Sequence, residues 1–177
     1  MNMTDSSKPN NDVIQTLRTA HQNQTQLNLM ADQKANILIG TLVLMFTVVL
    51  TRIITLAEND QNVLLILAVF ALMQIVPLVL TVLVLIPKNI NSANMNRIED
   101  IGNPLFFGFF TQYSQQQYSD YMSAILVDNE SARRMLVNDI YQIGLILRRK
   151  YRLLRLAYVS ALLGVAMPIL LWFLFSI

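Results

Sequence analysis

Five basic residues lie close together near the C-terminal end of the chain: Arg148, Arg149, Lys150, Arg152 and Arg155. On a helix, Arg148, Arg152 and Arg155 share one face. A guanidinium group presents a fork of N–H donors that matches a phosphate group. Basic residues beside an apolar stretch also hold anionic lipid headgroups, at about 1 kcal/mol per residue. The cluster therefore predicts an anion site, either for lipid headgroups or for a nucleotide phosphate.

A second pair of charges, Asp32 and Lys34, lies just before an uncharged apolar stretch that runs from Ala35 to Thr51. A charge so close to hydrocarbon is costly unless it finds a partner or reaches water. Two residues apart on a helix, these side chains point about 200° from each other and cannot pair together. We therefore expect Asp32 to contact an arginine between positions 148 and 155, and Lys34 to reach headgroups or bind a phosphate.

Two further polar residues have alternative roles. His21, the one histidine of the chain, could sense pH or contact a ligand, but an exposed or amide-bonded imidazole is the commoner case. Gln74 lies near the middle of an apolar stretch, one turn before Pro77. There it would either hydrogen-bond to a neighbouring helix or line a pore.

An aromatic cluster lies in a turn-like context between Gly102 and Phe110, where Asn103 and Pro104 punctuate the backbone. Four of these nine residues are phenylalanine. Such rings are expected to leave water, so a packed core is the simpler interpretation and stacking against a nucleotide base is the alternative.

Few residues could catalyse a reaction. The chain has one histidine, no cysteine, no glycine-rich phosphate loop and no spacing typical of metal ligands. The carboxylates Asp128 and Glu130 are better explained as charges that complement the dipole at a helix start. We therefore expect no enzyme, no bound metal, no cofactor and no nucleic-acid partner.

The elements that position these residues are expected to be transmembrane helices. Of the 177 residues, 54% are apolar and only 14% are charged, and the mean hydropathy is +0.46. This composition is typical of a membrane protein. Three uncharged stretches are long enough to cross about 30 Å of hydrocarbon. They predict transmembrane helices at residues 35–57, 61–87 and 156–177, and the uncharged part of the first is 35–51.

The basic residues predict the orientation. Of the thirteen Lys and Arg residues, all except Arg52 precede the first span or lie between Lys88 and Arg155. By the positive-inside rule, the N-terminus is cytoplasmic and the C-terminus lies on the opposite, periplasmic side. The start of the chain lacks an apolar core followed by a cleavage site, so we expect no removable secretion signal.

The cytoplasmic region is expected to combine a helix at residues 12–34 with the segment 88–155. Residues 1–11 lack apolar periodicity and predict a disordered tail, with the helix beginning near Asn10 or Asn11. The amide-rich residues 89–103 predict a loop that could include one helical turn.

Two helix starts are visible in the longer segment. Ser114 and Gln117 fit a capping box that opens a helix ending near Val127. Asp128 or Asn129 then caps a long helix that continues into the third span. The predicted fold class is an all-α membrane protein: three transmembrane helices with a helical cytoplasmic region.

Three short motifs resemble, in their order and placement, the Pycsar transmembrane effector family (PycTM). They are Ala31-Asp32-Gln33-Lys34-Ala35, Asn103-Pro104-Leu105-Phe106-Phe107-Gly108 and Arg149-Lys150-Tyr151-Arg152-Leu153-Leu154-Arg155. The resemblance extends from about Asp12 to the last span. It implies antiphage defence by abortive infection: a partner cyclase makes a cyclic pyrimidine mononucleotide, cyclic CMP or cyclic UMP, and the effector impairs the bacterial inner membrane.

A strand-rich nucleotide-binding module of about a hundred residues does not fit this chain. A nucleotide pocket would therefore be helical and could lie between subunits. The candidate contacts supply cations for the phosphate, rings for the base and polar groups for its edges: Asp32, Lys34, Asn103, Phe106, Phe107, Arg149, Lys150 and Arg152.

The oligomeric state, the effect on the bilayer and the function each have alternatives. Three helices do not easily enclose a pore, so we expect a homo-oligomer, which could form a defined pore or disorder the bilayer. Two rival functions remain: a constitutive membrane anchor or scaffold, and a holin-like lytic protein that needs no nucleotide trigger.

Overall fold

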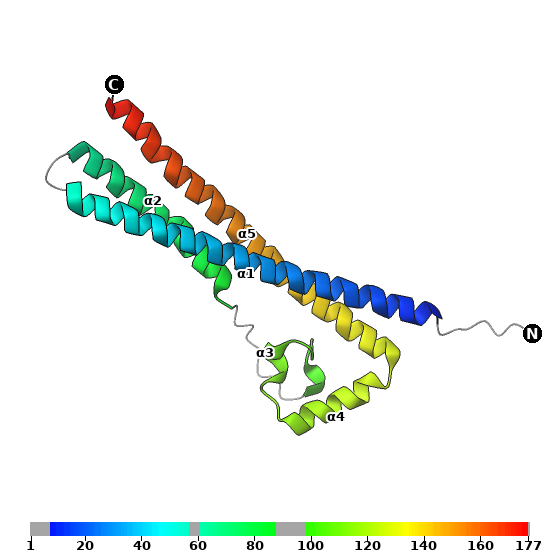
Figure 1. Ribbon diagram of the computed structural model, residues 1–177. Coiled ribbons are helices and arrows are strands. Elements are labelled where there is room, and N and C mark those ends of the chain that lie inside the picture. Colours follow the sequence, from blue (N-terminus) through cyan, green and yellow to red (C-terminus); the bar gives the residue numbers. More distant parts are fainter. Residues whose placement is uncertain (1–7, 57–60, 88–97, 177) are drawn as a thin grey trace, which may run out of the picture. The chain divides into compact units, whose positions relative to one another are not determined.

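The structure is a computed structural model that describes residues 8–56, 61–87 and 98–176 (Figure 1). The described residues form helices and no strand, so the predicted all-α class is confirmed. In chain order the helices are α1 (Lys8–Leu56), α2 (Gln61–Leu85), the 3-10 helix η1 (Ile98–Asp100), α3 (Phe107–Phe110), α4 (Gln115–Leu126) and α5 (Asn129–Ser176).

Three of the described helices, α1, α2 and α5, are long and apolar enough to cross a membrane. This confirms the predicted class of membrane protein. Helix α1 has 49 residues and α5 has 48, whereas a span needs about 20. Each of these two helices therefore carries a polar part as well as an apolar part.

Helix α1 begins at Lys8, earlier than the predicted start at Asn10 or Asn11. Pro9 lies in its first turn, where the missing N–H costs nothing because the first N–H groups of a helix have no partner within it. The tail predicted at residues 1–11 is therefore too long at its C-terminal end. Residues 1–7 lie outside the described residues, as do positions 89–97 of the predicted loop.

Both predicted helix caps are present. The Ser114 hydroxyl accepts a hydrogen bond from the Gln117 N–H at 3.3 Å, and the Gln117 side chain accepts one from the Ser114 N–H at 3.0 Å. The Asp128 carboxylate accepts hydrogen bonds from the N–H groups of Glu130 and Ser131 at the start of α5. The hydrogen bond from the Ser131 hydroxyl has the largest effect on the Asp128 carboxyl. Together with those from the N–H groups, it lowers the pKa of Asp128 below its usual value.

The described residues fall into two compact units. We call residues 8–28 and 98–147 the polar unit, and residues 29–56, 61–87 and 148–176 the span unit. Each long helix contributes its N-terminal part to the polar unit and its C-terminal part to the span unit.

The core of the span unit consists of two clusters of buried residues. One joins Ala31 and Ala35 of α1 to Val84 of α2 and Leu154 of α5. The other joins Leu38, Leu42 and Ala157, with Leu78 of α2 packed against it. From the first cluster to the second, the residue numbers rise along α1 and α5 and fall along α2. Within this unit, α1 and α5 run parallel to each other and α2 runs antiparallel to both.

A polar contact lies further along the same helices. Gln74 of α2 is 1% exposed, and its amide nitrogen lies 3.5 Å from the carbonyl oxygen of Ala161 on α5. A Cβ atom on Gly164 would lie only 2.8 Å from that nitrogen, so glycine makes room for the amide. Pro168 cannot donate a backbone hydrogen bond to the Gly164 carbonyl. Of the two roles considered for Gln74, the contact favours the interhelical hydrogen bond.

We predict that Gly164→Ala lowers the thermal unfolding midpoint of the purified protein in detergent. The added methyl group meets the buried Gln74 amide, with its nitrogen at 2.8 Å and its carbon at 3.2 Å, so this side chain must shift at a cost of about 1–2 kcal/mol. Gly40→Ala is the matched control, because no atom lies within 4 Å of its Cβ position. That change should leave the midpoint unchanged or raise it.

Adding Gln74→Ala to the Gly164→Ala variant should remove the clash. Equal midpoints for the two glycine variants, or no recovery in the double variant, would contradict this account of the contact.

Candidate functional site

A buried hydrogen-bond network joins three segments of the polar unit. Asp139 of α5 is 5% exposed, and one carboxylate oxygen lies 2.7 Å from Nε2 of His21 on α1. The other oxygen accepts a hydrogen bond from the Asn103 side chain at 2.8 Å. Asn103 also donates to the side-chain oxygen of Gln142 at 3.0 Å. The segment before α3 is thereby hydrogen-bonded to α5, and Asp139 of α5 is in turn bonded to α1.

Asn103 is fully buried, and its amide is already in use. Its nitrogen donates to Asp139 and Gln142, and its oxygen accepts from the Leu105 N–H at 3.0 Å. An amide nitrogen has two hydrogens to donate. Asn103 therefore has no donor left for a base edge while the network is intact.

Asp139 and Gln142 are not among the residues predicted from the sequence. Asp139 follows Leu136 by three residues and precedes Ile143 by four, so it interrupts the apolar stripe of α5. A carboxylate in such a stripe needs a hydrogen-bonding partner. That pattern could have identified Asp139, and the one histidine of the chain was an available partner.

The aromatic residues of the polar unit pack on one another. The rings of Phe106 and Phe109 meet edge to face at 5.7 Å, and Phe110 stacks on Tyr118 at 4.8 Å. The Tyr118 hydroxyl donates a hydrogen bond to the Pro104 carbonyl at 3.1 Å. These contacts are those of a small packed core. The side chain of Phe107 lies outside the described part of the chain.

An ion pair joins α1 to α5 in the span unit. The Lys150 ammonium donates to both carboxylate oxygens of Asp32, at 2.6 and 2.9 Å. The expected contact between Asp32 and the basic cluster is present, but the expectation of an arginine was wrong. Lys150 precedes the buried residues Leu154 and Ala157 by one and two helical turns. It is therefore the basic residue on the packed face of α5.

Lys34 makes a different contact. Its ammonium lies 5.6 Å from the centre of the Tyr151 ring, within the range of a cation–π interaction. The Lys34 side chain is exposed. Its charge can therefore also meet a headgroup or a phosphate.

The four arginines of the basic cluster are all exposed: Arg148, Arg149, Arg152 and Arg155. None of them forms an ion pair with a carboxylate of residues 8–56, 61–87 or 98–176. Their charge is available to an external anion.

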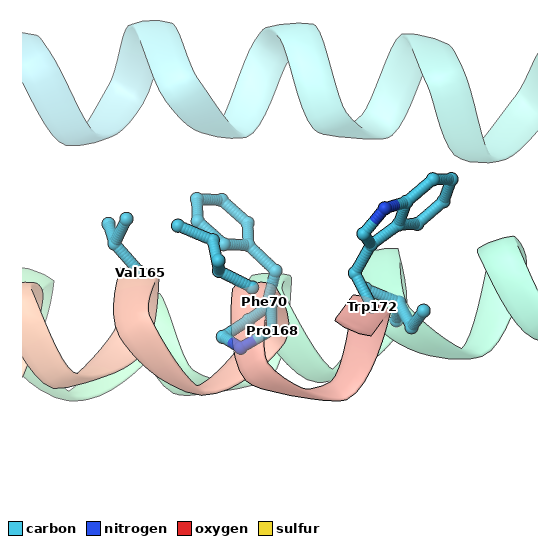
Figure 2. Close-up of a pocket in the computed structure, with 6 residues that line it drawn as sticks. Phe70, Val165, Pro168 and Trp172 are labelled. Carbon is cyan, nitrogen blue, oxygen red and sulfur yellow. The ribbon is translucent and has the colours of Figure 1, made fainter. Parts of the chain in front are cut away.

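An apolar groove of about 240 Å³ lies between α2 and α5 in the span unit (Figure 2). It is lined by Ile66, Phe70, Val165, Pro168, Ile169 and Trp172. Nucleotide sites need polar groups that fix the orientation of the ligand. An apolar lining suits hydrocarbon better than a nucleotide.

The eight candidate contacts are divided between the two units. Asn103, Phe106 and Phe107 belong to the polar unit, and the other five belong to the span unit: Asp32, Lys34, Arg149, Lys150 and Arg152. Of these five, the structure brings Asp32 and Lys150 together. Within the described ranges, no three His, Cys, Asp or Glu residues could hold a metal ion.

These features define a class: a helical membrane protein with three potential spans and a compact polar unit. Residues 15–177 match the family model of the Pycsar effector protein domain, PycTM, and the chain belongs to this family. It is therefore an antiphage defence effector with a transmembrane role, in a family that works with cyclic-nucleotide cyclases and is not known to catalyse reactions. No curated protein and no solved structure matches the chain.

We predict that Asn103→Ala increases local unfolding of the segment that contains α3. The change removes a hydrogen-bond donor from Asp139 and an acceptor from the Leu105 N–H, at a cost of about 1–3 kcal/mol. Hydrogen exchange measured by mass spectrometry should speed up in residues 101–110. Asn138→Ala, an exposed neighbour of Asp139, is the control and should leave exchange there unchanged. Equal exchange in both variants would show that the network does not hold this segment.

A charge swap tests the ion pair. Asp32→Lys places a second cation against Lys150 and should destabilise the protein by about 1–2 kcal/mol. Adding Lys150→Asp restores opposite charges and should recover most of the loss. The measurement is the thermal midpoint of the single and double variants in detergent. Adding Arg149→Asp in place of Lys150→Asp is the control, and equal recovery from it would exclude a specific pair.

Proposed function

We propose that this effector binds cyclic CMP or cyclic UMP and, in response, impairs the integrity of the bacterial inner membrane. Phage propagation then stops because the infected cell can no longer support it. The family match over residues 15–177 carries this proposal. Three helices of span length support the membrane as its target.

The distribution of charge supports an orientation with the polar unit in the cytoplasm, where a cyclase would release the nucleotide. Twelve of the thirteen Lys and Arg residues precede the first apolar stretch or lie between Lys88 and Arg155. Cytoplasmic segments carry such an excess. The C-terminus would then be periplasmic.

The contacts in each unit reduce the number of residues that we propose for binding the nucleotide phosphate. Lys150 is already neutralised by Asp32, and the Asn103 donors are occupied. Arg149 and Lys34 have no carboxylate partner among the described residues. They are the cations that we propose for the nucleotide phosphate.

Arg149 and Lys34 do not converge within one chain. Lys34 lies over Tyr151, and on α5 the positions of Arg149 and Tyr151 are about 200° apart. One phosphate would therefore meet both cations only if a second copy supplied one of them. This geometry supports a homo-oligomer in which one subunit supplies Arg149 and another supplies Lys34.

Dye-filled liposomes that contain the full-length protein test the proposal. Cyclic CMP, cyclic UMP and cyclic AMP are added separately, and we expect dye release with one or both pyrimidine nucleotides only. Release without nucleotide would favour a holin-like protein. No release under any condition would favour an anchor or scaffold.

Two variants extend this experiment to the phosphate contact. Arg149→Gln should raise the nucleotide concentration that gives half-maximal release by about tenfold or more, because one charge-assisted contact is lost. Arg134→Gln is the control, since Arg134 is exposed and its partner is Glu130. Equal responses of the two variants would remove Arg149 from the site while leaving the nucleotide trigger intact.

A further inference from the structure

Helix α5 has two opposite faces where its apolar part begins. Lys150, Leu154 and Ala157 lie on the face that packs within the span unit. At about 100° per residue, Arg148 and Arg152 lie about half a turn away from that face, and Arg155 lies with them. The exposure of all three arginines agrees with this geometry.

The arginine face continues directly into an exposed apolar face of the same helix. Its members follow at the same angular position and are all large: Val159, Leu162, Leu170 and Phe173. Between 48% and 70% of the surface of each is exposed. In a membrane, such a face is covered by lipid acyl chains. The headgroup of a lipid lying along this face would reach the three arginines.

The charge of this face has no partner in the span unit. Asp32, the one Asp or Glu among the described residues of the span unit, is bonded to Lys150 on the opposite face of α5. None of the three arginines pairs with a carboxylate of the described residues. Unpaired cations beside hydrocarbon are stabilised by anions at the membrane surface. A phosphodiester also matches the forked donors of a guanidinium group.

We propose that Arg148, Arg152 and Arg155 form a binding surface for the headgroup of an anionic phospholipid, with the acyl chains lying along the apolar face of α5. This assigns Arg152 to lipid and not to the nucleotide. Arg149 lies about 100° from Arg148 around the helix and is outside the surface. The lipid contact does not depend on the nucleotide trigger.

Native mass spectrometry of the full-length protein in detergent tests the surface. The protein is given equal amounts of phosphatidylglycerol and phosphatidylcholine, and retained lipids are counted. The wild type should retain phosphatidylglycerol in preference. Near an anionic surface each basic residue is worth about fivefold in association. The variant R148Q/R152Q/R155Q should therefore lose at least about tenfold of the preference, whereas R148K/R152K/R155K should keep most of it.

Arg149→Gln is the matched control, because it removes one charge from the same cluster but from another face. R152Q should reduce the preference more than R149Q does, and thermal midpoints should show that both variants fold. Equal losses in R149Q and R152Q would overturn the proposal, since bulk charge would then explain the preference. Displacement of phosphatidylglycerol by glycerol 3-phosphate or by cyclic CMP at an equal concentration would also overturn it, since the surface would then recognise a free phosphate.

Discussion

A charge at the edge of an apolar span must find a partner or reach water, and this constraint organises the span unit. Asp32 and Lys150 satisfy it together through two hydrogen bonds. Lys34 satisfies it at the surface, over the Tyr151 ring. The arginines point away from the packed face. Because Lys150 neutralises the carboxylate on one side of α5, the other side keeps its whole positive charge.

Small side chains determine how closely the spans approach. Ala31 and Ala35 of α1 and Ala157 of α5 are fully buried, so backbone and short side chains form much of the contact. Gly164 has the same effect between α2 and α5, where it admits the amide of Gln74. In lipid, helices gain little from burying apolar surface, and close packing with interhelical hydrogen bonds provides the stabilisation instead. The alanine and glycine positions are therefore as important for this unit as its large apolar residues.

The sequence predicted the elements well, because each depends on local signals: apolar length for the spans, Ser114 with Gln117 for one cap, and Asp128 for another. The contact of Asp32 with the basic cluster was predicted solely from the energetic cost of an unpaired charge next to hydrocarbon. The sequence did not predict Lys150, because that choice depends on which face of α5 packs. The bond between His21 and Asp139 spans 118 positions, and no local pattern encodes such a partner. The position of Asp139 in the apolar stripe showed only that a partner was required.

The polar side chains of the spans limit what the span unit can offer to water. The hydroxyls of Thr41, Thr47 and Thr51 donate to backbone carbonyls of their own helix. Thr81 and Ser160 do the same. Among the buried side-chain atoms of the span unit, the oxygen of Gln74 is the polar atom without a hydrogen-bond partner. A water-filled path between these helices would satisfy that oxygen but would meet little other polar lining. Because Gln74 is buried against Gly164, water reaches that oxygen only if α2 and α5 separate at this contact.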